Sequence, residues 1–225
     1  DFDAKGQRLF LVGGSWRAIA KLDMARQNYP LKVLHEYRMV PRDLRRTLKW
    51  IQNTDLATLR QLTGIGAERM SLIPTASHVL DSVLRRLKPS EVYVSSYGLR
   101  EGLLWEQMPD VLRARDPLIE ACRHAEARDA RMPGFGKTLF HFVKPLFPRM
   151  SKSRARVVKA ACLLHDVSWR AHPDYRAEVC FDYATRANLG GLSHSARIFL
   201  GLALLHRYKN SRAERFAPLL EMIEE

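Results

Sequence analysis

The stretch "LFLVGGSWRAIA" at residues 9–20 joins an apolar run to two glycines, a serine and an arginine. Residues 8–12 have the length and the β-forming side chains of a buried strand. Residues 16–26 carry apolar side chains at helical spacing, and Ser15 is the expected cap of that helix. The layout of strand, tight turn and helix returns at residues 91–102, "EVYVSSYGLREG". The sequence therefore predicts an α/β unit with two similar corners that form two walls of one site.

The rest of the first half fits between and after these corners. Residues 31–39 alternate in polarity, which predicts an edge strand or an extended loop. Pro41 opens a helix, Thr54 is the expected cap of the next, and further helices are expected over 75–87 and 99–108.

No convincing strand follows residues 108–117, where the pattern changes. Helices fit at 117–130, 137–147, 151–168, 174–188, 195–209 and 214–224. We therefore predict two domains, an α/β domain over residues 1–115 and an all-α domain over residues 116–225. A sheet of two strands is poor by itself, so we expect a missing N-terminal half or a partner chain to complete it.

The composition indicates a basic globular protein. The 225 residues carry a net charge of +13, with +5 in residues 1–120 and +8 in residues 121–225. Such a field attracts nucleic acid, an acidic membrane or a phosphate polymer, although a solubilising arginine surface is the alternative. No apolar run is long enough for a membrane span and no signal peptide is visible. The three cysteines stand in apolar surroundings, which predicts reduced, buried thiols in a cytoplasmic protein.

The two corners have the chemistry of an anion site. Gly13 and Gly14 leave the backbone bare, Ser15 offers a hydroxyl, and Arg17 could grip phosphate oxygens. Ligands of α/β sheets bind outside the carboxyl ends of strands, where helix N-termini lie. The second corner offers a similar set: Ser95, Ser96, Gly98, Arg100 and Glu101. The alternative is that the glycine pair serves only a tight turn.

Two other motifs lie in the helical half; the first is rejected as a phosphate loop and the second suggests a metal site. "GFGKT" at 134–138 resembles the end of a phosphate-binding P-loop, but Arg131 stands where the first glycine belongs and no strand precedes it. His165 and Asp166 form the adjacent pair that is typical of HD-type metal phosphohydrolases. His141 could supply an earlier ligand and His206 could replace the absent later aspartate. The alternative is a hydrogen-bonded pair inside a helical core.

Three stretches together carry a resemblance to a known family: "VGGSWRAIAKLDM" at 12–24, "VSSYGLREGLLW" at 94–105 and "AACLLHDVSWRAHPDYRAE" at 160–178. The chain resembles the exopolyphosphatase and guanosine-pentaphosphate phosphohydrolase (Ppx/GppA) family over nearly its whole length. The resemblance implies a ribonuclease-H-like half-domain of the actin/hexokinase/Hsp70 type, followed by an HD-like helical domain. It also implies a phosphate cleft, Mg²⁺ as cofactor and a homodimer.

By this resemblance, matched residues line the cleft: Gly13, Gly14, Ser15, Arg17, Ser96, Tyr97, Gly98, Arg100, Glu101 and Gly102. His165 and Asp166 match a vestigial metal site. The family's first-half phosphate loops and its glutamate base have no match here, so no catalytic residue is expected in this chain. It is interpreted as the C-terminal part of a longer enzyme, inactive by itself.

The function expected from the resemblance is removal of terminal phosphate from inorganic polyphosphate. From the positive charge of the helical part, Arg154 and Arg156 are the expected contacts for the polymer. Hydrolysis of guanosine pentaphosphate (pppGpp) is the near alternative. Two other classes stay open: an HD-type metal phosphohydrolase working from residues 117–225, and a polyanion-binding module without catalysis.

Overall fold

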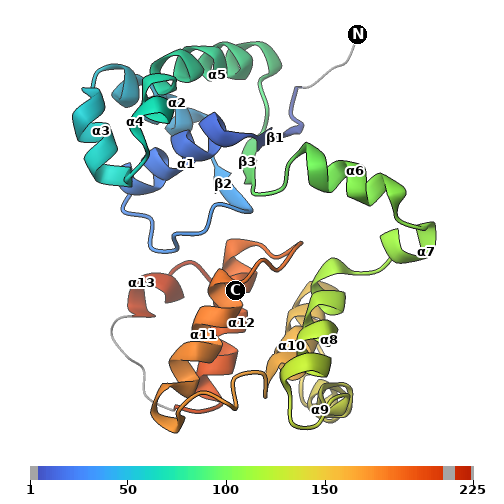
Figure 1. The fold of residues 1–225 in the computed structure, drawn as a ribbon. Helices are drawn as coiled ribbons and strands as arrows, with labels where there is room; N and C mark the ends of the chain where they lie inside the picture. Colours follow the sequence, from blue (N-terminus) through green and yellow to red (C-terminus); the bar gives the residue numbers. More distant parts are fainter. Residues whose placement is uncertain (1–4, 210–215, 224–225) are drawn as a thin grey trace. The chain divides into compact units, whose positions relative to one another are not determined.

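The computed structural model describes residues 5–209 and 216–223. The chain forms two compact units, Asp1–Met108 and Pro109–Glu225, which are described separately below. Most of the described residues are helical, and a small sheet lies in the first unit (Figure 1). The predicted division between residues 115 and 116 falls just before the first long helix of the second unit.

Three strands form the sheet, β1 (Arg8–Val12), β2 (Tyr37–Met39) and β3 (Glu91–Ser95), in the order β1-β3-β2. β1 and β3 are parallel, and Val12 lies opposite Ser95 at their carboxyl ends. β2 is a short antiparallel edge strand on β3. The strands predicted at 8–12 and 91–95 are confirmed. Of residues 31–39 only the last three pair as a strand, because the left-handed backbone of Glu36 (φ 63°) turns the chain onto β3 only there.

The helices of the first unit are α1 (Gly14–Arg26), α2 (Pro41–Gln52), α3 (Leu56–Thr63), α4 (Ala67–Ser71), α5 (Ile73–Leu87) and α6 (Leu99–Gln107). Two predicted caps are wrong. Gly13 precedes α1, so Ser15 lies inside its first turn. Asp55 caps α3 by accepting from the Thr58 N–H at 2.9 Å, while the Thr54 hydroxyl donates to a carbonyl of the preceding helix.

The core of the first unit lies on one face of the sheet. α1 packs on β1 and β3, and α2 and α5 pack against α1. Leu11, Val92 and Val94 are buried beneath them, whereas Phe10 and Val12 of β1 are about half exposed. Alternation along the strands thus separates a covered face from an open one.

One buried carboxylate joins three elements of this core. Asp23 of α1 accepts from the Tyr37 hydroxyl of β2 at 2.7 Å and from the Thr47 hydroxyl of α2. Arg26 donates to the same threonine at 2.8 Å. Burial, followed by the nearby Asp23 charge, raises the pKa of Tyr37 well above its usual range, so the phenol stays a hydrogen-bond donor.

The second unit contains no strand among its described residues. Its helices are α7 (Asp110–Arg113), α8 (Pro117–Asp129), α9 (Phe135–Val143), α10 (Lys152–Leu164), α11 (Arg176–Arg186), α12 (His194–His206) and α13 (Ala217–Leu220), with short 3₁₀ turns η1 (Lys144–Leu146) and η2 (Pro173–Tyr175). α10 packs against α8, α9 and α12, and α11 packs on α12. The helix predicted over 214–224 is shorter, and residues 214, 215 and 224 lie outside the described residues.

The three cysteines, Cys122, Cys162 and Cys180, are buried and unpaired as predicted. Burial raises the pKa of the Cys122 thiol to about 12 and that of Cys162 to about 11. Among the helices of the described residues, none combines the length and the apolar character that crossing a membrane requires.

The glycine of the "GFGKT" stretch has a packing role. Gly136 lies inside α9, and its N–H donates to the buried Glu126 carboxylate at 2.7 Å. A Cβ at this position would lie 2.7 Å from the Cys162 carbonyl oxygen and 2.7 Å from Cα of Leu163. The absent side chain therefore permits α9 to approach α10 closely, and no phosphate loop forms here.

We predict that Gly136→Ala destabilises the protein by about 1–3 kcal/mol, the usual cost of overpacking a close contact. The matched control is Gly102→Ala in α6, where a Cβ meets nothing within 4 Å and alanine favours the helix. Urea unfolding followed by circular dichroism compares the two. Equal stability of Gly136→Ala and wild type would contradict this account of the α9–α10 contact.

Candidate functional site

The two predicted corners lie side by side. Because β1 and β3 are parallel neighbours, the segments after Val12 and after Ser95 leave the sheet at the same edge. α1 begins at the first segment and α6 at the second. The first N–H groups of a helix have no acceptor within the helix and carry the positive end of its dipole. The edge thus presents two helix N-termini together.

Arg17 ties one corner to the other. Its Nη1 donates to the Ser96 carbonyl oxygen at 3.2 Å, and its Nε donates to the Gly13 carbonyl oxygen at 3.3 Å. The guanidinium therefore spans the gap between the segment after β1 and the segment after β3. The positive charge of Arg17 is not neutralised by an ion pair, because both of its acceptors are backbone carbonyls and no carboxylate among the described residues pairs with it.

The second corner is also held from the β2 side. His35 Nδ1 accepts from the Ser96 N–H at 3.3 Å, and the His35 ring lies 4.6 Å from the Tyr97 ring. The Ser95 hydroxyl accepts from the Tyr97 N–H at 3.0 Å. Both polar atoms of the Ser96 backbone are consequently fixed, its N–H by His35 and its carbonyl by Arg17.

Glu101 serves the backbone of its own corner. Its Oε2 accepts from the Gly98 N–H at 2.6 Å, which is the glutamate half of a capping box at the start of α6. The Gly98 N–H, and to a smaller extent Arg100 and Arg17, hold the pKa of the Glu101 carboxyl below its usual range. An ionised, hydrogen-bonded cap of this kind is a poor proton donor, so Glu101 positions the turn.

The first corner contains a cation that the sequence analysis missed. Arg69 of α4 lies over Gly14, where an added Cβ would be 3.4 Å from Arg69 Nε and 3.5 Å from its Cζ. Gly13 has φ of 137°, a region that side chains other than glycine rarely adopt. The sequence analysis assigned no element to the "GIGAERM" segment that carries Arg69, and its folding into α4 brings this residue to the corner.

Guanidinium groups and helix N-termini make this edge suitable for an anion such as phosphate. The one carboxylate that the predicted corner residues supply, Glu101, is already hydrogen-bonded. These residues therefore do not form a magnesium site by themselves, because Mg²⁺ prefers carboxylate oxygens and water as ligands.

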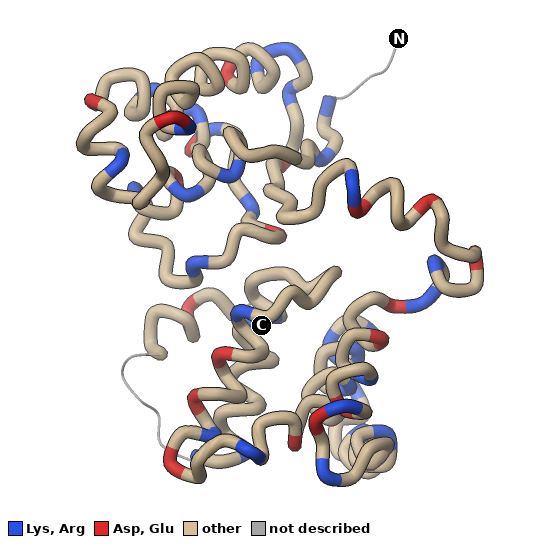
Figure 2. The backbone as a smooth tube through the Cα atoms, in the orientation of Figure 1, with Lys and Arg blue, Asp and Glu red and all other residues tan. Residues whose placement is uncertain are grey.

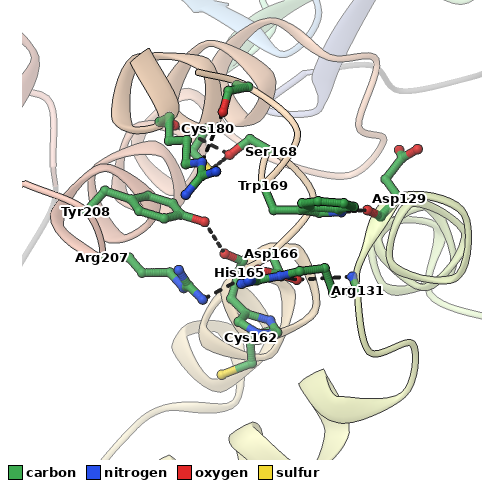
Figure 3. A network of polar contacts seen from close by, with 12 residues as sticks. Asp129, Arg131, Cys162, His165, Asp166, Ser168, Trp169, Cys180, Arg207 and Tyr208 are labelled. Carbon is green, nitrogen blue, oxygen red and sulfur yellow. Dashed lines mark hydrogen bonds and ion pairs between the residues drawn. The ribbon is translucent and has the colours of Figure 1, made fainter. Parts of the chain in front are cut away.

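The His165–Asp166 pair lies in the second unit, just after α10, in a network of polar contacts (Figure 3). Asp166 Oδ1 accepts from Arg131 Nη2 at 2.6 Å, and Oδ2 accepts from Arg131 Nε at 3.0 Å and from its backbone N–H at 3.1 Å. Arg207 lies 3.7 Å from the same carboxylate. The Arg131 hydrogen bonds, opposed by partial burial, lower the pKa of Asp166 to about 2.

His165 does not face a metal position. Its Nδ1 lies 2.8 Å from the Cys162 carbonyl oxygen, and burial holds the pKa of the imidazole below its usual range. The other candidate ligands are elsewhere: His206 contacts the Lys209 carbonyl and His141 is exposed beside Phe140. Over residues 5–209 and 216–223, no three His, Cys, Asp or Glu side chains gather as a metal site. Two guanidinium groups occupy the Asp166 carboxylate, so this pair does not fit a metal ion.

The two arginines expected to contact a polymer are partly engaged. Arg156 pairs with the Asp116 carboxylate and donates to the Gly191 carbonyl oxygen at 2.7 Å. Arg154 lies over the Phe199 ring, 4.4 Å from its centre. Arg156 therefore has a structural contact besides any role in binding.

Comparisons with known proteins agree with these two units. Residues 4–111 match the family model described as "Ppx/GppA phosphatase family", and residues 118–225 match "Exopolyphosphatase, C-terminal". The chain is also similar to "Retrograde regulation protein 2" of Saccharomyces cerevisiae, with 28% identity over 141 residues. That match covers 59% of this chain and 23% of the yeast protein, so the chain spans about a quarter of the relative's length.

We predict that Asp166→Asn destabilises the protein at pH 7 by about 2 kcal/mol, since charge-assisted hydrogen bonds are typically worth about 1.5–3 kcal/mol. The folded-state pKa of Asp166 is depressed to about 2, so its contribution is present above the unfolded pKa of about 4 and is lost as the pH falls toward 2. Urea unfolding should show a smaller difference in the free energy of unfolding between wild type and variant at pH 3 than at pH 7. A gap that is constant with pH would contradict the ion-pair assignment.

Proposed function

Since the chain belongs to the Ppx/GppA phosphatase family, we propose that its first unit is one wall of a phosphate-chain cleft in an exopolyphosphatase. The observation that carries this proposal is that Arg17 joins the two corners by hydrogen bonds. The N-termini of α1 and α6 and the guanidinium groups of Arg17 and Arg69 therefore lie at one edge of the sheet. Phosphoryl transfer depends on positioning and on stabilising charge over the phosphate oxygens. This edge supplies both.

The residues of the edge divide into ligand groups and supports. Arg17 and Arg69 are the cations that would face the equatorial oxygens of a terminal phosphate, and the N–H groups at the start of α1 would donate to it. His35 and Glu101 would act as positioning residues, because each holds a backbone N–H of the second corner. Gly13 and Gly14 would let the phosphate approach the backbone.

The remaining parts of the enzyme would come from a first half-domain outside this chain. By family resemblance, that half would supply the base that activates water and the Mg²⁺ that neutralises phosphate charge. The sheet offers it a place to join, because β1 is the outer strand and its open face carries the exposed Phe10 and Val12. We propose that further strands pair along β1, giving a ribonuclease-H-like fold, and that the HD-like second unit binds the polymer in a cytoplasmic enzyme.

Two alternatives keep specific support. The same phosphate chemistry serves pppGpp, whose triphosphate end resembles the end of polyphosphate. A regulatory, non-catalytic function is the second alternative, since the curated relative is named as a regulation protein and no catalytic residue is expected in this chain. An HD-type metal hydrolase is disfavoured by the guanidinium groups that hold Asp166.

We predict that the 225-residue chain alone releases no substantial phosphate from polyphosphate or pppGpp, because the base and two phosphate loops of the family are absent. A protein that contains the chain together with the first half-domain should release phosphate from one of them. Phosphate release is measured colorimetrically for both proteins on both substrates. Turnover by the isolated chain at the rate of the longer protein would overturn the proposal, and binding without turnover by both would favour the regulatory alternative.

In the longer protein, Arg17→Ala should lower kcat/KM by about one to two decades, since a charge-assisted contact of about 1.5–3 kcal/mol is lost at the transition state. The control is Lys21→Ala, an exposed cation on the same helix, with little expected effect.

Gly14→Val should also block turnover by filling the space below Arg69. His165→Ala should instead lower the melting temperature and leave kcat/KM of the folded protein unchanged. Loss of turnover in His165→Ala at an unchanged melting temperature, together with full activity of Arg17→Ala, would place the chemistry in the second unit.

A further inference from the structure

The second unit has an apolar hollow that no part of the proposed function uses. It lies where the short turn η1 leads into α10, and it encloses about 480 Å³. Phe199 of α12 joins the hollow to the interior, because it also packs against the core of the unit. We call the hollow the η1–α10 groove, and its walls are formed mainly by Leu146, Phe147, Met150, Arg154, Val158 and Phe199.

The outer wall of the groove has a backbone that is already held in place. Pro145 and Pro148 restrict the conformation of this segment. The Phe147 N–H donates to the Lys144 carbonyl oxygen at 3.2 Å, and the Met150 N–H donates to the Phe147 carbonyl oxygen at 3.1 Å. A wall that is formed in advance loses little conformational entropy when a partner binds.

Large apolar side chains stand uncovered at the groove. Leu146 is 64% exposed and Phe147 is 56% exposed. Phe142 of α9 is 73% exposed and precedes Leu146 by four residues, so the two lie on the same side of the helical segment. Contiguous exposed apolar surface of this kind marks interaction sites. Because the apolar surface continues beyond the hollow to Phe142, an elongated partner would cover more of it than a small molecule could.

The charge at the groove has one sign. Its charged lining residues are Arg149 and Arg154, and no carboxylate of the described residues lines it. Arg154 lies over the Phe199 ring, and Arg149 makes no ion pair within the part of the chain that the structure describes. Lys and Arg residues occur along both units (Figure 2), but the sequence between Asp129 and Asp166 contains no acidic residue. A partner that complements this surface must bring the negative charge itself.

We propose that the η1–α10 groove binds an acidic, amphipathic helix of a partner protein, with the apolar side of that helix in the hollow and its carboxylates beside Arg149 and Arg154. Interface cores are rich in aromatic residues, Met and Arg and poor in Lys, Asp and Glu, as this lining is. Apolar grooves accept helices through side chains spaced three and four residues apart. The proposal does not depend on the proposed function, since it involves neither the corners nor a phosphate ligand.

A second copy of this chain fits the groove less well than an acidic partner. In a two-fold dimer the same patch of both copies meets itself. The arginines of one groove would then face the arginines of the other, and no carboxylate of the described lining would separate them.

The experiment selects binders of the 225-residue chain from a phage-displayed library of random peptides of about 15 residues, which corresponds to four helical turns. The enriched peptides should combine Leu, Ile or Phe at helical spacing with Asp and Glu. The most enriched peptide is then synthesised, and its Kd is measured by fluorescence anisotropy. Enrichment of basic or uncharged peptides, or no enrichment, would overturn the proposal.

A pair of double variants tests whether that peptide lies in the groove. Leu146→Ser/Phe147→Ser should weaken its binding by about tenfold or more, because truncation of central apolar anchors has the largest effect at interfaces. The matched control is Leu103→Ser/Leu104→Ser, which removes two exposed leucines of α6 in the first unit, and its effect should be less than about twofold. Unchanged melting temperatures establish that both variants fold. The reverse result would place the peptide on α6 and contradict the proposal.

The charge of the groove is tested with a second pair of variants. Arg149→Gln should weaken peptide binding by about threefold at low salt and by less at high salt, because salt screens an exposed charge. The control is Lys137→Gln, an exposed cation of α9 that does not line the groove, with little expected effect. Equal losses in the two variants would indicate diffuse attraction to a basic surface and would overturn the proposal.

Three further measurements identify other occupants. Sedimentation velocity would show a wild-type dimer that Leu146→Ser/Phe147→Ser dissociates if a second copy covers the groove. Cosedimentation with phosphatidylglycerol vesicles that this variant abolishes would indicate a membrane surface. Binding of a single-stranded RNA oligonucleotide that the variant abolishes would indicate bases stacked on Phe147. Each of these three results would overturn the proposal.

Discussion

The parallel pairing of β1 with β3 is the constraint on which the rest of the first unit depends. With Val12 opposite Ser95, both connections to the following helices leave the sheet at one edge. An antiparallel pairing of the same two strands would place the two turns at opposite ends of the sheet. In the observed parallel arrangement the two turns are close together, so the Arg17 side chain reaches from one to the other. Its two hydrogen bonds fix the spacing between the turns.

The elements that the sequence predicted are those with a strong local signal. Residues 8–12 and 91–95 are compact runs of β-forming residues, and the long helices of the second unit carry apolar side chains at regular spacing. The failures have non-local causes. α4 is only five residues long, so its apolar pattern is too short to detect, and Arg69 was missed with it. The bond between His35 and Ser96 joins residues that are 61 positions apart, and no local pattern records it.

Net charge also proved an incomplete guide to the surface. Several arginines of the second unit are internal crosslinks: Arg197 is almost fully buried and donates to the carbonyls of Ala184, Ala187 and Leu189. Arg131 and Arg156 are held by carboxylates on other elements. Arginine suits this use because its planar fork can satisfy several acceptors at once. The net charge of the unit therefore overstates the number of cations that a ligand could contact.

The Asp166 network has a consequence for how the second unit responds to its surroundings. A metal ion that joined these segments would have to be captured from solution, and the stability it gave would rise and fall with its concentration. The Arg131 guanidinium is part of the chain and is always present beside its carboxylate. Chelating agents or metal starvation should consequently leave this junction intact. The stability of this junction therefore depends on pH, through the ionisation of Asp166, and does not depend on the concentration of a metal ion.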